Sequence, residues 1–287
     1  MKSVSTKLSL GLLTRAFTCA ASISVTTSLC AQQPPPAEKG SVESSGKFVP
    51  KTSPNPAASG PVPTREEAEA ALLKDLKIDR LSPNQLKIGL VTLDQSTRTV
   101  RFRSVVNMTQ GNVEYALVTE TGKVHEAILT TKASPRDIHL ALLLLGLKSA
   151  TAKPAADSAL EIPAAAAVKI RVEWETNGPL SSVPLSSLIG LTSQDPSKPV
   201  HRTLPDGKWL YVGSGFDASG FRAQREGSLI SLIGDDSALV INPGSDRSND
   251  EIHVPNAALL PARGMPVTVI LTCPPTATTP PPPLPTP

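Results

Sequence analysis

The stretch VEYALVTETGKVHEAILTTKASPRDIHLALLLLGL, residues 113–147, carries side chains that could do chemistry at close spacing. Glu114 and Tyr115 precede a turn, His125 and Glu126 follow it, and His139 comes after a Ser-Pro dipeptide. Imidazole and carboxylate groups exchange protons near neutral pH and also bind divalent metals. These five residues are therefore the ligand-binding candidates. No cofactor is evident from the sequence, although the same groups would suit a divalent metal, and no residue can be assigned a catalytic role.

The segments VEYALVT and VHEAILTT flank a turn at Thr121-Gly122, a pattern that predicts a β-hairpin. Neighbouring side chains of a strand point to opposite faces, so His125 and Glu126 would need a bulge to bind one ion together. In the register of this hairpin Glu114 would lie about 13 Å from His125.

A joint site would require His139 to approach the hairpin from the following helix, beside His125 or Glu126. Within the predicted hairpin, Tyr115 would lie closer to Glu126 than Glu114 would lie to His125. The other interpretation is structural, with a polar hairpin face and a hydrogen-bonded helix histidine, and the residue pattern favours it. The spacing H-E-x-x-L also differs from the helical H-E-x-x-H zinc motif.

Two helices are indicated by their start signals. Thr64 and Glu67 form a capping-box pattern ahead of AEAALLKDL, which predicts a helix over 65–76. Ser134-Pro135 starts a second helix that we expect to end near Gly146. Its predicted core residues, spaced at helical intervals, are Ile138, Ala141, Leu142 and Leu145, with Leu143 and Leu144 widening the buried face.

Most of the remaining patterned segments are typical of strands. LKIGLVTLD and RTVRFRSVVN predict a first hairpin, and five further strands are expected in 168–174, 208–214, 227–234, 237–241 and 265–272. An Ala/Pro-rich loop is expected at 148–166. We therefore predict one α+β domain over 65–273, with mainly antiparallel sheet, one long buried helix at about 135–146 and an amino-terminal helix.

The two ends of the chain differ from this domain in composition. Residues 1–31 combine Lys2, Lys7 and Arg15 with an apolar, small-residue stretch ending in Ala31, which predicts a signal peptide cleaved near Ala31 and export to the periplasm or beyond. A lipoprotein is less favoured, because Leu29 precedes Cys30 where a small residue is needed. Sixteen of the 29 prolines lie in 32–64 and 274–287, so we expect a disordered Pro/Ser-rich linker and a disordered Pro-rich tail.

Charge and cysteine content limit the classes of partner and cofactor. Removing the leader lowers 28 basic side chains to 25, equal to the 25 acidic ones, so electrostatics give no reason to expect nucleic acid as a partner. Only Cys273 remains, which rules out an internal disulfide and a Cys-based metal cluster in that chain. No apolar run has the length of a transmembrane helix.

The succession of GLVTLDQSTRTVRFRSVVN, NVEYALVTETGKVHEAIL and DIHLALLLLGL, followed by KWLYVGSGF, REGSLISLIGDDSALV and PVTVIL, resembles the YdjY domain of exported bacterial proteins. The resemblance covers most of 80–273 and implies no established activity. Its ferredoxin-like description does not carry over, because the cysteines for a cluster are missing.

The sequence favours an uncharacterised, non-enzymatic binding or structural module of the bacterial cell envelope, with a small ligand or another envelope protein as partner. The alternative is a metal-assisted or acid-base enzyme using His125, Glu126 and His139. The oligomeric state and the role of the Pro-rich flanks are left open by the sequence.

Overall fold

The computed structural model describes residues 62–74, 76–150, 158–176, 178–193 and 202–275. The predicted signal peptide and most of both Pro-rich flanks lie outside the described residues, as does the middle of the predicted loop at 148–166. Within the described part, no helix is long and apolar enough to cross a membrane.

The described α-helices are short, and single turns of 3₁₀ helix join several strands. The helices are α1 (Arg65–Lys74), α2 (Pro135–Leu144), α3 (Arg222–Glu226), η1 (Val124–Glu126), η2 (Ala164–Ala166), η3 (Leu185–Leu188) and η4 (Ser245–Ser248). The strands are β1 (Asp79–Ser82), β2 (Gln85–Ile88), β3 (Val91–Asp94), β4 (Thr99–Val106), β5 (Tyr115–Thr119), β6 (Ala127–Thr131), β7 (Ala167–Glu175), β8 (Leu180–Pro184), β9 (Ile189–Leu191), β10 (Arg202–Thr203), β11 (Trp209–Tyr211), β12 (Phe216–Asp217), β13 (Gly220–Phe221), β14 (Ser228–Ser231), β15 (Val240–Ile241), β16 (His253–Pro255) and β17 (Pro266–Thr272).

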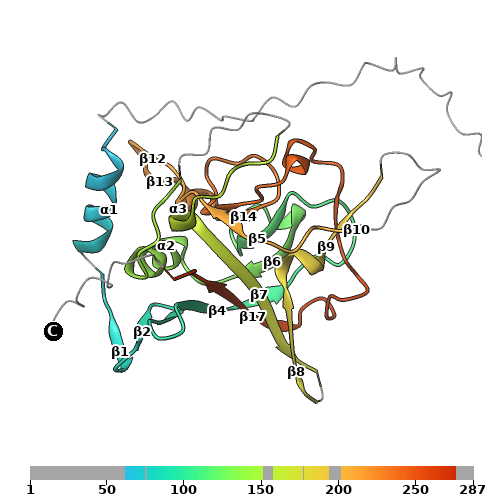
Figure 1. Cartoon of the computed structure of the whole chain (residues 1–287), viewed down its shortest axis with the longest axis horizontal. Helices are drawn as coiled ribbons and strands as arrows, with labels where there is room; N and C mark the ends of the chain where they lie inside the picture. Colours follow the sequence, from blue (N-terminus) through green and yellow to red (C-terminus); the bar gives the residue numbers. More distant parts are fainter. Residues whose placement is uncertain (1–61, 75, 151–157, 177, 194–201, 276–287) are drawn as a thin grey trace, which may run out of the picture. The chain divides into compact units, whose positions relative to one another are not determined.

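Eight of these strands close into a barrel in the order β4, β17, β7, β11, β15, β14, β5 and β6, with β6 pairing back onto β4. Figure 1 shows the long strands β17 and β7 side by side, and β17 pairs with β4 on its other edge. Strands β3, β2 and β1 extend the sheet from β4, and β8 pairs with β7 outside the ring. Closure satisfies backbone hydrogen bonds that an open sheet would leave at its edges.

The predicted α+β class is therefore wrong, because the described chain is mostly β and its sheet closes on itself. The predicted long buried helix is α2, which spans only 10 residues and is an accessory to the barrel rather than a layer covering a sheet. Alternating apolar residues indicate strands one by one. They do not indicate whether the first and last strands of a sheet will pair.

The predicted hairpin at 113–131 is also wrong. A turn does form, with the amide of Gly122 donating to the Thr119 carbonyl at 3.0 Å. The chain then runs back through η1, so that β6 lies parallel to β5, with Tyr115 beside Ala127. Each strand finds its antiparallel partner elsewhere, β14 for β5 and β4 for β6. His125 and Glu126 consequently lie in a 3₁₀ turn instead of on a strand.

The first predicted hairpin is confirmed in β3 and β4, which pair antiparallel. The segment LKIGLVTLD is divided, however, into β2 and β3, which pair with each other. The chain reverses at Gly89, whose φ of +55° lies in the left-handed region that glycine tolerates best. The expected strand over 265–272 is confirmed by β17, and that over 168–174 by β7.

The interior of the barrel is filled by alternate side chains of its strands, including Phe102 of β4, Leu117 of β5 and Leu271 of β17. Helix α2 adds Ile138 to this set, and the gap among these side chains measures only about 10 Å³. That volume is about one water molecule, so these core side chains are closely packed.

The predicted starts and ends of the two helices are largely confirmed. Thr64 and Glu67 exchange both capping-box hydrogen bonds, at 2.9 and 3.2 Å. At the end of α2, Gly146 has φ +80° and the amide of Leu147 donates to the Leu142 carbonyl, which is a Schellman ending. The predicted core residues Ile138, Ala141, Leu142 and Leu145 are all buried.

The start of α2 differs from the expectation, because Ser134 makes no side-chain cap to its own helix. Its hydroxyl donates to Oε1 of Gln224 at 2.7 Å, and the same oxygen accepts the amide of Arg136 at 3.2 Å. A side chain of α3 therefore caps α2, which ties the two helices together.

We expect Ile138→Ala to lower the free energy of unfolding by about 2–5 kcal/mol, because the shorter side chain leaves a cavity in the barrel core. Urea unfolding of the full chain measures this loss. Leu144→Ala, on the half-buried side of the same helix, is the matched control and should cost clearly less. Equal losses in the two variants would contradict the placement of Ile138 inside the barrel.

Candidate functional site

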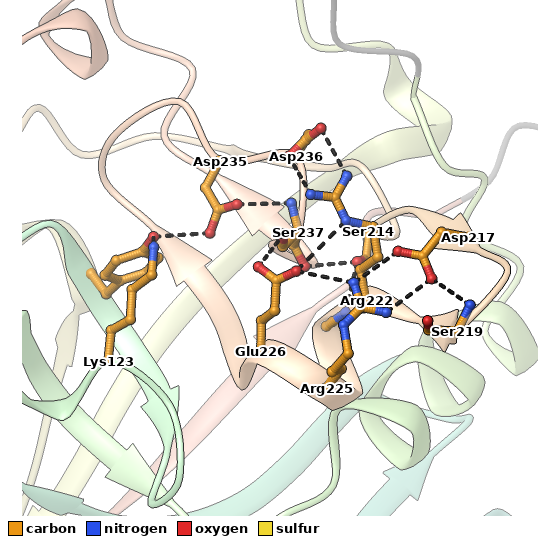
Figure 2. A network of polar contacts seen from close by, with 12 residues as sticks. Lys123, Ser214, Asp217, Ser219, Arg222, Arg225, Glu226, Asp235, Asp236 and Ser237 are labelled. Atoms are coloured by element: carbon orange, nitrogen blue, oxygen red, sulfur yellow. Dashed lines mark hydrogen bonds and ion pairs between the residues drawn. The ribbon is translucent and has the colours of Figure 1, made fainter. Parts of the chain in front are cut away.

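A chain of polar contacts runs across one part of the surface, from β5 to the β12–β13 turn (Figure 2). It begins at Tyr115, whose hydroxyl donates to Oδ2 of Asp235 at 2.9 Å. Lys123 donates to the same hydroxyl at 2.5 Å, and its Nζ also lies 4.7 Å from the centre of the tyrosine ring. Lys123 reaches this position because the 120–126 connection runs back alongside β5.

The contacts continue from Asp235 toward helix α3. Oδ1 of Asp235 accepts the amide of Ser237 at 2.8 Å, and the Ser237 hydroxyl donates to Oε2 of Glu226 at 2.6 Å. Burial, followed by the negative charge of Asp235, raises the pKa of the Tyr115 hydroxyl far above its usual value. Tyr115 therefore stays protonated at neutral pH and serves as a hydrogen-bond donor instead of a nucleophile.

Two arginines of α3 complete the network, and each forms a two-pronged contact with an aspartate. Arg222 donates to both oxygens of Asp236 at 2.9 and 3.0 Å, and Arg225 to both oxygens of Asp217 at 2.9 and 2.8 Å. The hydrogen bonds from Arg225 lower the pKa of Asp217. Such paired contacts fix orientation more than they add stability, because the partners are partly exposed to water.

A second cluster lies around His139, which is fully buried on α2. Its Nδ1 is 2.7 Å from the Tyr211 hydroxyl, and its Nε2 is 3.6 Å from Oε1 of Glu69 on α1. The imidazole packs against Phe221 and Phe216, with ring centres 5.0 and 6.3 Å away. Burial lowers the pKa of His139, although Glu69 acts in the opposite direction, so the ring is neutral at pH 7.

Arg65, at the start of α1, connects the two clusters. Its guanidinium donates to the carbonyl oxygens of Gly213 and Ser214 at 3.3 and 2.6 Å, and to the hydroxyl of Ser149 at 3.2 Å. It also lies 3.4 Å from Glu69. Because the hydroxyl of Ser214 donates to the Ser237 carbonyl at 2.7 Å, the cluster around His139 and the network of Figure 2 meet at the 213–214 turn.

The sequence-predicted site residues are divided between these places. Tyr115 belongs to the network of Figure 2, and His139 to the second cluster. The side chain of His125 is 77% exposed, and its Nε2 lies 3.7 Å from Oε2 of Glu126. The amide of Glu114 donates to the Glu126 carbonyl at 2.9 Å, so these two residues are neighbours across β5 and β6.

His125, Glu126 and His139 do not form one metal-holding group. Among the residues that the structure describes, no group of three or more His, Cys, Asp and Glu side chains is arranged to hold a metal ion. Cys273 is buried directly after β17, and burial raises its pKa to about 12.

Sequence reasoning missed several residues of these clusters, above all Arg65, Glu69 and Tyr211. The spacing of Arg65 and Glu69, four residues apart on a predicted helix, was the available signal. Sequence reasoning also missed the fully buried His253, whose Nε2 lies 2.8 Å from Oδ2 of Asp246. Nothing in the local sequence indicates that His253, at the start of the short strand β16, is buried.

The lowered pKa of His139 predicts a pH-dependent stability. Below the ordinary histidine pKa of about 6.5 the unfolded chain binds a proton that the folded protein rejects, so the stabilisation is fully present above that pH and is lost as the pH falls toward the lower folded-state pKa. The free energy of unfolding, measured with urea between pH 7.5 and 5, should therefore fall less steeply for His139→Gln than for wild type. His125→Gln, at an exposed histidine, should retain the wild-type slope; equal slopes in all three proteins would contradict a buried neutral His139.

Comparison with known proteins places this geometry in a family. No curated protein and no solved structure matches the chain. The family model of the YdjY domain matches residues 91–272, which is more than half of the sequence. The matched range includes the whole barrel, His139, Tyr211 and the network of Figure 2, whereas α1 precedes it. The chain therefore belongs to the YdjY domain family.

Proposed function

We propose that this YdjY domain is a non-enzymatic binding module of the bacterial cell envelope, which engages another envelope protein through the face formed by α1, α3 and the 213–217 turn. The packed barrel interior is the observation that carries the proposal. Because the gap among these core side chains measures only about 10 Å³, we expect a partner to bind on the outer surface.

The polar groups of this face support the proposal. The contacts of Arg222 and Arg225 hold α3 and the two neighbouring loops in one arrangement. Asp236 keeps 69% of its side chain exposed despite its contact with Arg222, so it remains available to a partner. A face held in one arrangement loses little conformational entropy on binding, which favours recognition of a protein surface.

Export is part of the same proposal. It rests on the leader-like residues 1–31, with Lys2, Lys7 and Arg15 ahead of an apolar stretch that ends at Ala31. A single cysteine in the remaining chain is compatible with an oxidising compartment, because no second thiol is present to form an unwanted internal disulfide.

A photo-crosslinking amino acid at position 236 should yield one defined covalent complex with an envelope protein in the native cell. The same amino acid at position 180, which is exposed at the tip of the β7–β8 hairpin, is the control and should not yield that complex. Mass spectrometry of the purified complexes measures both. Identical products at the two positions, or none at position 236, would argue against the proposed face.

The alternative is a metal-assisted or acid-base enzyme using His125, Glu126 and His139. The chain of contacts from Glu69 through His139 to the Tyr211 hydroxyl favours an acid-base role for His139. Glu69 carries a pKa that burial raises but that His139 and Arg65 lower by more, so it is ionised beside a neutral imidazole. A carboxylate that orients an imidazole is a recurring arrangement in acid-base catalysis.

Metal content separates the binding module from a metal-assisted enzyme. Residues 32–287, purified without a His-tag, should contain no stoichiometric metal if the domain is a binding module, and His125→Ala and Glu126→Ala should alter stability only slightly. A metal-assisted enzyme requires a metal that raises the melting temperature and is lost in at least two of the variants His125→Ala, Glu126→Ala and His139→Ala. Elemental analysis and thermal unfolding measure both outcomes.

A further inference from the structure

The guanidinium of Arg65 is contacted by a set of groups outside helix α1, which we call the cradle. We define the cradle as the carbonyl oxygens of Gly213 and Ser214, the hydroxyl of Ser149 and the ring of Phe216, whose centre lies 5.9 Å from the guanidinium carbon. Neutral oxygens and an aromatic face are the groups that bind the edge and the flat side of a guanidinium. The only carboxylate that contacts Arg65 among the described residues is Glu69, on the same helix.

The backbone of the cradle is shaped for a close approach. Gly213 and Ser214 both have φ in the left-handed region, at +68° and +59°. A Cβ on Gly213 would collide with the Ser149 hydroxyl and would lie 2.9 Å from Nη1 of Arg65. Glycine is therefore required here for two reasons, its backbone conformation and the space that the guanidinium occupies.

The cradle is held in place without help from α1. The hydroxyl of Ser214 donates to the Ser237 carbonyl at 2.7 Å and accepts the amide of Ala223 at 3.0 Å. The amides of Val212 and Gly213 both donate to the Leu239 carbonyl, at 2.9 and 3.0 Å. These contacts come from β11, α3 and the segment before β15, so the acceptors stay aligned if the arginine leaves. A preformed site of this kind binds a matching group at low entropic cost.

Helix α1 presents a second group to the same surface, one turn after Arg65. Glu69 reaches toward His139, with 3.6 Å between Oε1 and Nε2. The surface therefore contacts an arginine and a glutamate that stand four residues apart on one helix face. The apolar burial of α1 is limited to the buried Ala68 and the partly buried Leu72, which packs against the core.

The cradle and helix α1 differ in whether they lie within the range that matches the family model. Ser149, Gly213, Ser214 and the side chain of His139 all lie within the residues 91–272 that match the YdjY model. Helix α1 ends at Lys74, before that range begins. These residues of the recognition surface thus lie within the matched range, whereas the helix that fills it lies before that range.

The geometry points to a recognition site in this domain for a helical segment of another protein that carries arginine and glutamate four residues apart, with α1 as its resident occupant. The inference rests on the proposed function, because it names the chemistry by which that face would take its partner. A competing helix gains access when α1 lifts off, and binding in trans is weak while α1 is attached, since the tethered helix acts at high effective concentration.

The test uses the full chain with Arg65→Ala and Glu69→Ala, which removes both resident contacts and leaves the cradle intact. A synthetic peptide of residues 62–74 should cause saturable chemical-shift changes at the amides of Gly213 and Ser214 in this variant, and much weaker ones in wild type. The matched control is the same peptide with alanine in place of its arginine, which should not bind.

A third protein checks that binding occurs in the cradle. Adding Gly213→Ala to the double variant should weaken peptide binding strongly, because its Cβ would collide with the Ser149 hydroxyl and lie only 2.9 Å from the guanidinium position. Since a left-handed alanine also strains the turn, Ser149→Ala in the same background is the second variant and should weaken binding without that strain. Binding that is equal for the two peptides, or unaffected by both cradle variants, would overturn the inference, as would no binding to the double variant.

These results are independent of the crosslinking at position 236. A defined crosslinked partner together with no arginine-dependent peptide binding would retain the proposed function and reject the recognition chemistry. Arginine-dependent binding without any crosslinked partner would reject position 236 as part of the partner interface, and would leave the cradle as a site for arginine-bearing helices.

Discussion

The pairing of β6 with β4 is the contact on which the rest of the structure depends. Val105 lies opposite Thr130 and Val106 opposite Leu129, and these pairs convert a row of strands into a closed ring. An open sheet of the same strands would expose backbone donors and acceptors along two edges. Closure also requires β6 to run parallel to β5, so that the connection through η1 must run back along the sheet.

That return path has a chemical consequence. It places Lys123 over Tyr115 and leaves His125 in an exposed turn, and so it separates residues that a hairpin would have gathered on one sheet. Closure has a second consequence, because side chains of the ring and Ile138 of α2 pack together with a gap of only about 10 Å³ among them. The proposed recognition uses the outside of the barrel, where α3 and the 213–217 turn are fixed by paired arginine contacts.

The attachment of α1 illustrates how polar contacts can specify a docking position with little apolar burial. A helix that buries Ala68 and part of Leu72 gains limited hydrophobic stabilisation, whereas Arg65 and Glu69 each require a particular arrangement of partner groups. Such contacts give modest net energy but strong geometric selectivity. This balance suits an occupant that can be exchanged. His139 lies beneath the same contact, and its neutral state keeps the buried side of the interface uncharged.

Local features were predictable from the sequence. The capping box of Thr64 and Glu67, the glycine that ends α2 and the alternation of apolar residues in β4, β7 and β17 depend on interactions among near neighbours. The buried face of α2 was predictable for the same reason, because Ile138 and Leu142 follow helical spacing. The family was recognisable from the order of these segments. The site was not, because Arg65, His139 and Tyr211 come together from positions far apart in the chain.

What the sequence alone determined was therefore approximately where most helices and strands lie, and which of their faces are apolar. The tertiary structure alone decided that β5 and β6 are parallel, that the sheet closes, and that Arg65 lies against Gly213 and Ser214. The physical reason is that local propensity acts within a few residues, whereas strand partners are chosen by the arrangement that pairs the backbone groups of the whole sheet and fills its interior. The position of every residue on the outer face follows from that choice.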